Sequence, residues 1–330
     1  EKGHDGLLGV LLPVAYACAA RLSWSALQFA GAVLEDAGTE RRQALDIITE
    51  PSALRERARA WSRSGETVGF VPTMGALHAG HASLLRLARE RAALVVASVF
   101  VNPTQFGPGE DLDAYPRDLK RDAALAREAG VDVLFAPQPG AMYAPEAATW
   151  VEVPALARHL CGASRPTHFR GVCTVVSKLF LLVRPTVAVF GQKDWQQLAI
   201  IRRMTADLGF DVEIVGAPIV READGLALSS RNVRLTPTER AEAVAINQGL
   251  ALAEELARGG TRDAGRILAA VRAFYTTAMP SGTVDYLECV DPGTIVPATA
   301  LAGAALFAAA VRFSAVRLID NRFVDVNAAS

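Results

Sequence analysis

The sequence predicts an α/β protein in which a Rossmann-like, doubly wound parallel sheet is followed by a smaller α+β C-terminal domain. Apolar strand-like runs alternate with helix-like runs between residues 67 and 220, as in a sheet covered by helices on both faces. The strand-like runs are continuous in Val, Ile, Leu and Phe, which fits burial on both faces. After residue 220 helices are followed by short strands, and 330 residues are enough for two domains.

The elements of the first domain, residues 46–220, alternate along the chain. Strands are expected at 68–71, 93–101, 132–136, 186–190 and 211–215, and helices at 82–92, 117–129, 172–183 and 195–207. Polar loops follow three of these strands, at 72–81, 102–115 and 191–194. Because ligands bind at the carboxyl ends of parallel strands, the three loops are predicted to line one cleft.

The second domain, residues 221–330, begins with a polar loop at 221–232 that is the expected hinge. Thr236 is the expected N-cap of an amphipathic helix that starts at Pro237 and runs to Arg258. A second helix at 262–277 and strands at 284–290, 304–313 and 316–319 complete a small α+β unit.

Composition excludes some partners. The formal charge of −1 arises from 34 basic and 35 acidic residues, so neither nucleic acid nor an anionic membrane is an expected partner. The four cysteines are scattered without metal-binding spacing, which fits a reduced cytoplasm, and Cys173 lies in an apolar run typical of a core residue. We therefore expect a cytoplasmic protein.

Residues 1–45 form an N-terminal extension to which the sequence assigns no role. Its two uncharged runs, 7–20 and 22–34, are each shorter than the roughly 18 to 20 residues that cross a bilayer. This favours a helical appendage, or a relic of a mis-set start, over a membrane-associated segment.

The most informative motif is the stretch 72–81, PTMGALHAGH, between a strand-like and a helix-like run. A Gly-rich turn that leads into a helix N-terminus binds anions, and His78 and His81 lie three residues apart on the first helical turn. We expect both histidines to contact phosphate, with an imidazolium stabilising charge on a departing pyrophosphate. The alternative is a pair of satisfied surface histidines.

Three further clusters have functional and structural interpretations. Lys193 in the stretch 191–194, GQKD, is a candidate phosphate partner, while Asp194 could bind a ribose hydroxyl or cap the next helix. Residues 229–232, SSRN, could wrap a triphosphate or form a Ser-type turn. Gln105 could hydrogen-bond a small hydroxy acid, although the preceding Asn-Pro also reads as a turn.

Five blocks together resemble the pantothenate synthetase family, the pantoate–beta-alanine ligases of the nucleotidyltransferase-like superfamily with a HIGH motif. They are PTMGALHAGH at 72–81, FVNPTQF at 100–106, SRPTHFRGV at 164–172, FGQKDWQQL at 190–198 and DGLALSSRN at 224–232. The resemblance runs from about residue 48 to 326 and departs from the family at Gln192, usually Glu, and at Trp195, usually Phe or Tyr.

The resemblance implies ATP-dependent condensation of pantoate with beta-alanine through a pantoyl adenylate, with release of AMP and pyrophosphate. It implies that the first domain binds ATP and pantoate, that the second is a lid, and that the enzyme is a homodimer. Magnesium would be carried by the nucleotide, with no metal site built from protein side chains. Its two rivals are a nucleotidyltransferase that keeps the adenylated product and a non-catalytic nucleotide-binding module.

The same resemblance assigns roles to individual residues. His81 is the expected proton donor, and His78, Lys193 and Arg231 are the other expected catalytic groups. Gln105 and Gln197 are expected to hold pantoate and beta-alanine. The expected ATP-binding residues are Met74, Gly75, Ala76, Leu77, His78, Ala79, Gly80, His81, Gly191, Gln192, Lys193, Asp194, Val220, Leu228, Ser229, Ser230 and Arg231.

Overall fold

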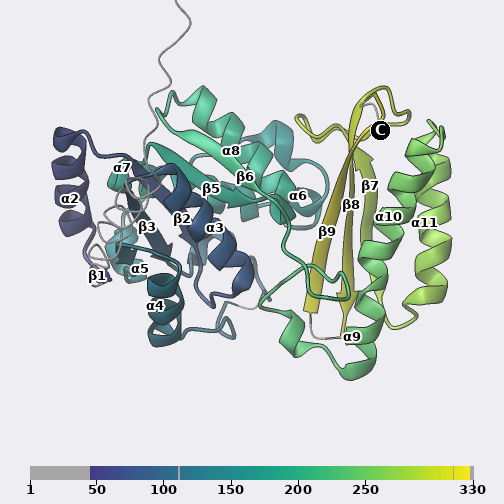
Figure 1. Cartoon of the computed structure of the whole chain (residues 1–330), viewed down its shortest axis with the longest axis horizontal. Helices are drawn as coiled ribbons and strands as arrows, with labels where there is room; N and C mark the ends of the chain where they lie inside the picture. The colour runs from purple at the N-terminus through teal and green to yellow at the C-terminus, as the bar shows by residue number, and fades with distance from the viewer. Residues whose placement is uncertain (1–44, 111, 315, 328–330) are drawn as a thin grey trace, which may run out of the picture. The chain divides into compact units, whose positions relative to one another are not determined.

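The computed structural model describes residues 45–110, 112–314 and 316–327, all of which belong to one compact unit, Ala44–Ser330 (Figure 1). The predicted N-terminal extension lies outside the described residues except for Leu45.

A six-stranded parallel sheet forms the first part of the fold, as predicted. Its strands are β1 (Asp46–Ile48), β2 (Val68–Thr73), β3 (Leu94–Val99), β4 (Val133–Phe135), β5 (Val187–Gly191) and β6 (Glu213–Ala217), in the order β1-β4-β3-β2-β5-β6. The edge strand β1 and the helix α2 (Pro51–Ser64) that follows it were not anticipated from the sequence. Neither element contains a continuous apolar run of the kind that identifies the central strands.

Helices cover both faces of this sheet. Successive side chains of a strand point to opposite faces, and in this sheet the side chains on both faces are apolar. Phe70 packs in a core with helices α2, α7 (His168–Val183) and α8 (Trp195–Asp207), whereas Val71 packs in a separate core with α3 (Ala79–Arg91) and α4 (Leu119–Glu128). Both side chains are fully buried. The alternation continues along β3, β4 and β5, which confirms a sheet buried on both faces.

The chain reverses its direction of sheet growth between β2 and β5, which are neighbours in the sheet. From β2 the sheet extends through β3 to β4, and the chain then returns to the other side of β2 to add β5 and β6. This is the topological switch point at which doubly wound sheets bind their ligands. The loops after β2 and β5 therefore lie where a ligand is expected.

A second, antiparallel sheet consists of β7 (Thr283–Val290), β8 (Ala304–Phe313) and β9 (Val316–Asp325). One face packs on α10 (Ala245–Arg258) and α11 (Ala264–Ala278), which lie side by side (Figure 1). On the other face, Leu306 and Ala308 join the core that contains α7 and α8. The small sheet is thus fixed directly to the large one, and the boundary after residue 220 stays a prediction.

Two helices differ most from their predicted bounds. The run to Arg258 consists of two helices, α9 (Pro237–Ala243) and α10, which are divided at Val244. Helix α9 is held by Ser314, after β8, which donates from its backbone N–H and its hydroxyl to the Glu239 carboxylate. Helix α7 begins at His168 instead of residue 172. Gly171 therefore lies inside the helix. A side chain is not tolerated at this position, because a Cβ would lie 2.5 Å from the Thr104 carbonyl oxygen.

Candidate active site

A cleft of about 830 Å³ opens at the carboxyl ends of β2, β3 and β5 and is closed on one side by β8 and β9. Residues from all three loops predicted to form one cleft line it. The predicted site residues that line it are Met74, His78, Gly80, His81, Gln105, Gly191, Lys193, Asp194, Gln197, Val220, Leu228, Ser229, Ser230 and Arg231.

The loop after β2 is held by Asp122 of α4. The two carboxylate oxygens of Asp122 accept hydrogen bonds from the backbone N–H groups of Ala76 (3.0 Å) and Leu77 (2.7 Å). Gly75 and Ala76 have φ angles of 90° and 51°, so two successive residues take the left-handed conformation that this turn requires. Burial raises the pKa of the Asp122 carboxyl, partly offset by these two hydrogen bonds. Asp122 therefore fixes the turn that delivers His78 to the cleft.

His78 and His81 cap the N-terminus of α3 reciprocally. The Nδ1 atom of His78 accepts from the Gly80 backbone N–H (3.1 Å), and Nδ1 of His81 accepts from the His78 backbone N–H (3.3 Å). A nitrogen that accepts a hydrogen bond carries no proton, so each neutral ring carries its proton on Nε2. The centroids of the two imidazole rings lie 4.1 Å apart. The pair thus offers two Nε2–H donors in this structure, and an imidazolium that stabilises a departing pyrophosphate stays a prediction.

The electrostatic surroundings keep both rings neutral. Burial lowers the pKa of His78 to about 4, with further contributions from Lys193 and Arg121. Burial lowers the pKa of His81 to about 3, with His78 and Lys193 adding to the effect. The charge of Lys193 is therefore close enough to influence both imidazoles, which supports one shared anion site.

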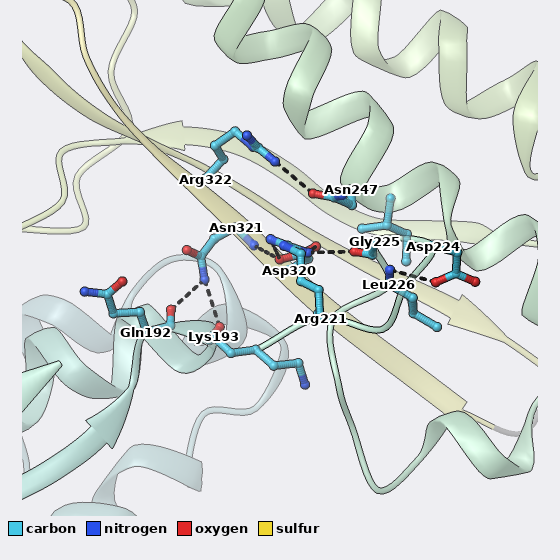
Figure 2. A network of polar contacts seen from close by, with 12 residues as sticks. Gln192, Lys193, Arg221, Asp224, Gly225, Leu226, Asn247, Asp320, Asn321 and Arg322 are labelled. Atoms are coloured by element: carbon cyan, nitrogen blue, oxygen red, sulfur yellow. Dashed lines mark hydrogen bonds and ion pairs between the residues drawn. The ribbon is translucent and has the colours of Figure 1, made fainter. Parts of the chain in front are cut away.

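The small sheet positions the backbone of Lys193 (Figure 2). The Asn321 side-chain amide, on β9, donates to the carbonyl oxygens of Gln192 (2.9 Å) and Lys193 (2.8 Å). The neighbouring Asp320 accepts two hydrogen bonds from the guanidinium of Arg221, at 2.6 and 3.0 Å. In Figure 2 the Lys193 side chain points away from Asn321, so the strand holds the main chain and leaves the ammonium group free to face the cleft.

A buried amide network orients Gln105. Its Oε1 accepts from Asn102 Nδ2 (3.1 Å), and its Nε2 contacts the Met74 sulfur at 3.0 Å. Asn102 is 1% exposed and also donates to the Gly171 carbonyl oxygen and accepts from the Tyr143 hydroxyl. Asn102 also accepts from Thr104, so it forms the expected turn as well as fixing Gln105.

The structure bears on the two interpretations of Asp194, ribose binding or helix capping, and on those of Ser229, phosphate binding or a Ser-type turn. Asp194 precedes α8 but forms no capping hydrogen bond within the described residues, and its side chain is exposed at the cleft. The Ser229 hydroxyl accepts from the Arg231 backbone N–H at 3.2 Å, so this stretch forms a Ser-type turn and lines the cleft as well.

Five of the predicted ATP-binding residues are not in the lining of the cleft: Gly75, Ala76, Leu77, Ala79 and Gln192. Leu77 is 2% exposed and belongs to the core beneath α3. Gln192 donates to the Gly216 carbonyl oxygen of β6 (3.3 Å), so its side chain points away from Lys193 (Figure 2). Any contact of these residues with the nucleotide stays a prediction.

The second departure from the family pattern, Trp195, has a structural role. Its ring stacks on Phe323 of β9 with centroids 5.5 Å apart, and its Nε1–H donates to the Pro292 carbonyl oxygen (2.9 Å). Trp195 therefore ties the start of α8 to the small sheet.

His168 lines the same cleft but was not predicted as a site residue. Its Nδ1 lies 3.0 Å from the Gln105 carbonyl oxygen, which can only accept, so Nδ1 carries the proton. The neighbouring Arg165 is engaged with the Glu110 carboxylate. Burial lowers the pKa of His168 to about 4, assisted by Arg165 and opposed by Glu110 and Asp194.

In the part of the chain that the structure describes, no group of three or more His, Cys, Asp or Glu side chains is arranged to hold a metal ion. Within the same residues, none of the helices has the length and apolar content of a membrane span. Three cysteines, Cys161, Cys173 and Cys289, are free. Cys173 is fully buried, as expected for a core residue, and burial raises the pKa of its thiol to about 12.

Comparisons with known proteins agree on one family. Residues 46–323 match the family described as pantoate-beta-alanine ligase. The chain is 77% identical over 278 residues to pantothenate synthetase of Solidesulfovibrio magneticus, an alignment that covers 84% of this chain and 98% of that protein. It is 57% identical to pantothenate synthetase of Heliobacterium modesticaldum, covering 81% and 96%.

Solved structures resemble the fold over the same region. The crystal structure of pantothenate synthetase from Thermus thermophilus aligns with a TM-score of 0.79 at 49% identity, covering 84% of this chain and 99% of that one. The pantoate-beta-alanine ligase from Francisella tularensis, complexed with beta-gamma ATP and beta-alanine, aligns with a TM-score of 0.70 at 30% identity, covering 84% and 97%.

Proposed function

This chain belongs to the pantoate–beta-alanine ligase family, and we propose that the cleft described above is where it forms and consumes the acyl adenylate. The enzyme is a ligase of pantothenate biosynthesis that condenses pantoate with beta-alanine through a pantoyl adenylate, releasing AMP and pyrophosphate. The observation that carries the placement is the convergence of His78, His81, Lys193 and Arg231 on one cleft that also contains Gln105 and Gln197.

The nucleotide phosphates are placed between the start of α3 and the loops at 191–194 and 229–231. The Nε2–H groups of His78 and His81 are donors, Lys193 and Arg231 are cations, and the helix N-terminus adds a partial positive charge. Adenylation builds negative charge on the α-phosphate and on the leaving pyrophosphate, and preorganised donors stabilise such charge. Because burial keeps His81 neutral, its expected role as proton donor would begin from the Nε2–H group.

The remaining groups fit the other parts of the substrates. Gly191 and Asp194 are assigned to the ribose end, and Met74, Val220 and Leu228 to the adenosine surroundings. Gln105 and Gln197 are assigned to pantoate, whose hydroxyl and carboxylate groups match amide donors and acceptors. The buried network through Asn102 supports Gln105 in this role because it restricts the rotation of the Gln105 amide.

Adenylation activates the pantoate carboxylate for attack by the amine. In the first step a carboxylate oxygen attacks the α-phosphorus and pyrophosphate leaves. In the second step the amine of beta-alanine attacks the activated carbonyl carbon and AMP leaves. Water would hydrolyse the intermediate, so residues 221–330 are assigned the role of a lid that excludes it.

Magnesium is proposed to accompany ATP, since the charges that line the phosphate region suit phosphate oxygens and no carboxylate cage occurs among the described residues. Family resemblance supports a homodimer, and the free, scattered cysteines support a cytoplasmic location.

Measuring products in the presence of ATP, pantoate and beta-alanine tests this function. We expect AMP, pyrophosphate and pantothenate in equal amounts. Accumulation of adenylated pantoate in the presence of beta-alanine would instead support the nucleotidyltransferase alternative. Binding of ATP with no pyrophosphate release, and no effect of His81→Ala, would indicate a non-catalytic module.

A further inference from the structure

The cleft contains three histidines, and hydrogen bonding divides them into two chemical kinds. His78 and His81 use Nδ1 as an acceptor and therefore present Nε2–H donors. His168 uses Nδ1–H as a donor to the Gln105 carbonyl oxygen and therefore carries a lone pair on Nε2. Within the described residues Nε2 of His168 has no hydrogen-bond partner. Two imidazoles thus suit anions, whereas the third suits an N–H or O–H donor.

The surroundings of His168 suit a neutral ligand that donates a hydrogen bond, such as a free amine. The carboxylates of Glu110 and Asp194 both interact electrostatically with the ring, and Arg165 is the cation that faces it. The Arg165 guanidinium donates to both oxygens of Glu110, at 2.6 and 2.5 Å, so these two opposite charges largely offset each other and Asp194 is the remaining carboxylate that acts on the ring. An amine entering here would meet the neutral Nε2 acceptor of His168 and the carboxylate of Asp194, which forms no capping hydrogen bond among the described residues.

His168 is also linked to the residue assigned to pantoate. Its Nδ1–H group holds the backbone of Gln105, whose side chain is fixed by Asn102 and Met74. An acyl group seated by Gln105 would therefore lie near the imidazole. Burial lowers the pKa of His168 to about 4, so the ring is neutral at physiological pH and its Nε2 atom keeps a lone pair.

We propose that His168 is the catalytic base of the second step, accepting a proton through Nε2 from the amine of beta-alanine as this amine attacks the pantoyl adenylate. This inference rests on the proposed function of the cleft. Beta-alanine loses a first ammonium proton to water and binds as the free amine. The nitrogen lone pair then forms the C–N bond, and one N–H proton passes to Nε2.

Collapse of the tetrahedral intermediate completes the step. The carbonyl re-forms, the bond from the acyl carbon to the phosphate oxygen breaks, and AMP leaves with that electron pair. The imidazolium returns its proton to solvent. The Asp194 carboxylate stabilises the imidazolium while it exists.

The test uses His168→Asn in the full-length chain. Asparagine places an amide donor near the position of Nδ1, which preserves a contact with the Gln105 carbonyl oxygen, but it has no titratable nitrogen. We expect pantoate-dependent exchange of pyrophosphate into ATP, measured without beta-alanine, to stay within about twofold of wild type. Pantothenate formation should fall by about 10² to 10⁴, the range typical of a lost general base.

Hydroxylamine provides an independent readout, because this weakly basic amine is already unprotonated at neutral pH and releases its proton readily. The variant should form the pantoyl hydroxamate at close to the wild-type rate. His159→Asn, a histidine that is not among the residues lining the cleft, is the matched control and should leave all three rates unchanged.

Three outcomes would overturn the proposal: normal pantothenate formation by His168→Asn, equal loss of exchange and of amide formation, or no recovery with hydroxylamine. If His168→Asn is unstable, His168→Gln is measured in the same three assays. Because glutamine does not preserve the contact with the Gln105 carbonyl oxygen, its pantothenate formation is judged relative to its own exchange rate, and a loss no greater than the loss of exchange would overturn the proposal. Failure of the wild-type chain to exchange pyrophosphate would contradict the proposed function itself and is therefore distinguishable.

Discussion

Asn321 donates its side-chain amide to the backbone carbonyl oxygen of Lys193 at 2.8 Å, and its other amide proton reaches the Gln192 carbonyl oxygen at 2.9 Å (Figure 2). Asn321 is 5% exposed and lies on β9 of the small sheet. The residue with the proposed phosphate-binding ammonium is therefore positioned by a strand more than one hundred residues later in the chain.

We expect Asn321→Ala to lower kcat by about tenfold or more while changing ATP affinity by less than about threefold, because misplacement of a transition-state contact affects turnover more than ground-state binding. Lys193→Ala should show the same pattern in stronger form. Steady-state kinetics together with equilibrium ATP binding measures both quantities.

Asn327→Ala is the matched control for Asn321→Ala. The Asn327 side chain also donates to a backbone carbonyl oxygen, that of Ala302, but it lies outside the cleft lining. If Asn327→Ala reduced kcat as much as Asn321→Ala, the effect would reflect general loosening of the small sheet, and a specific link to Lys193 would be wrong.

Gln105→Ala should impair the use of pantoate and spare ATP binding. The amide is held between Asn102 and Met74, so its removal deletes a preorganised hydrogen-bonding group. We expect the KM for pantoate to rise about 10- to 100-fold. Gln105→Glu, of similar size, should be worse because its carboxylate repels that of pantoate. A loss of ATP affinity with an unchanged KM for pantoate would place Gln105 in the wrong subsite.

Asp122→Ala should loosen the turn that carries Met74 and His78. It removes the acceptors of the Ala76 and Leu77 N–H groups, and the unsatisfied donor of Leu77, which is buried, destabilises the fold by about 1–3 kcal/mol. We therefore expect a lower free energy of unfolding in urea and a raised KM for ATP. Asp122→Asn retains one acceptor oxygen and should be intermediate. Unchanged ATP kinetics in a measurably destabilised Asp122→Ala would show that the turn does not control nucleotide binding.

The sequence was sufficient for the features that depend on local pattern. The continuous apolar runs identified β2 to β6, and the polar loops after β2, β3 and β5 do line one cleft. The PTMGALHAGH motif placed both histidines at the start of a helix. These predictions succeeded because strand burial, helix capping and Gly-rich turns are determined over a few residues.

Features that depend on distant contacts could not be predicted in this way. Asp122 reads as one more acid on an amphipathic helix, and Asn321 as a polar residue in a strand; their partners lie 46 and 128 residues away. His168 lies within the SRPTHFRGV block, but its tautomer is set by a carbonyl oxygen 63 residues earlier. The neutral state of His78 and His81 likewise depends on burial and on Lys193, which no local pattern reports.

That neutral state makes stability depend on pH in a defined direction. In the unfolded chain a histidine takes up a proton near pH 6.5, whereas folding lowers the pKa of His78 to about 4 and that of His81 to about 3. Between these values the unfolded state binds more protons, so the free energy of unfolding decreases as the pH is lowered from about 6.5 to 4.

A variant with both His78→Gln and His81→Gln removes this contribution while keeping side-chain acceptors at the helix N-terminus. Between pH 6.5 and 4.5 we expect wild type to lose stability more steeply than the variant, with a difference on the order of 2 kcal/mol for each imidazole. Urea unfolding at closely spaced pH values measures it. His168 and the carboxylates contribute equally to both proteins, so only the difference between the two curves reports on the pair. If the free energies of unfolding of wild type and variant changed in parallel across this interval, both imidazoles would titrate normally in the folded protein. The two rings assigned to the phosphates would then be mostly imidazolium at pH 6.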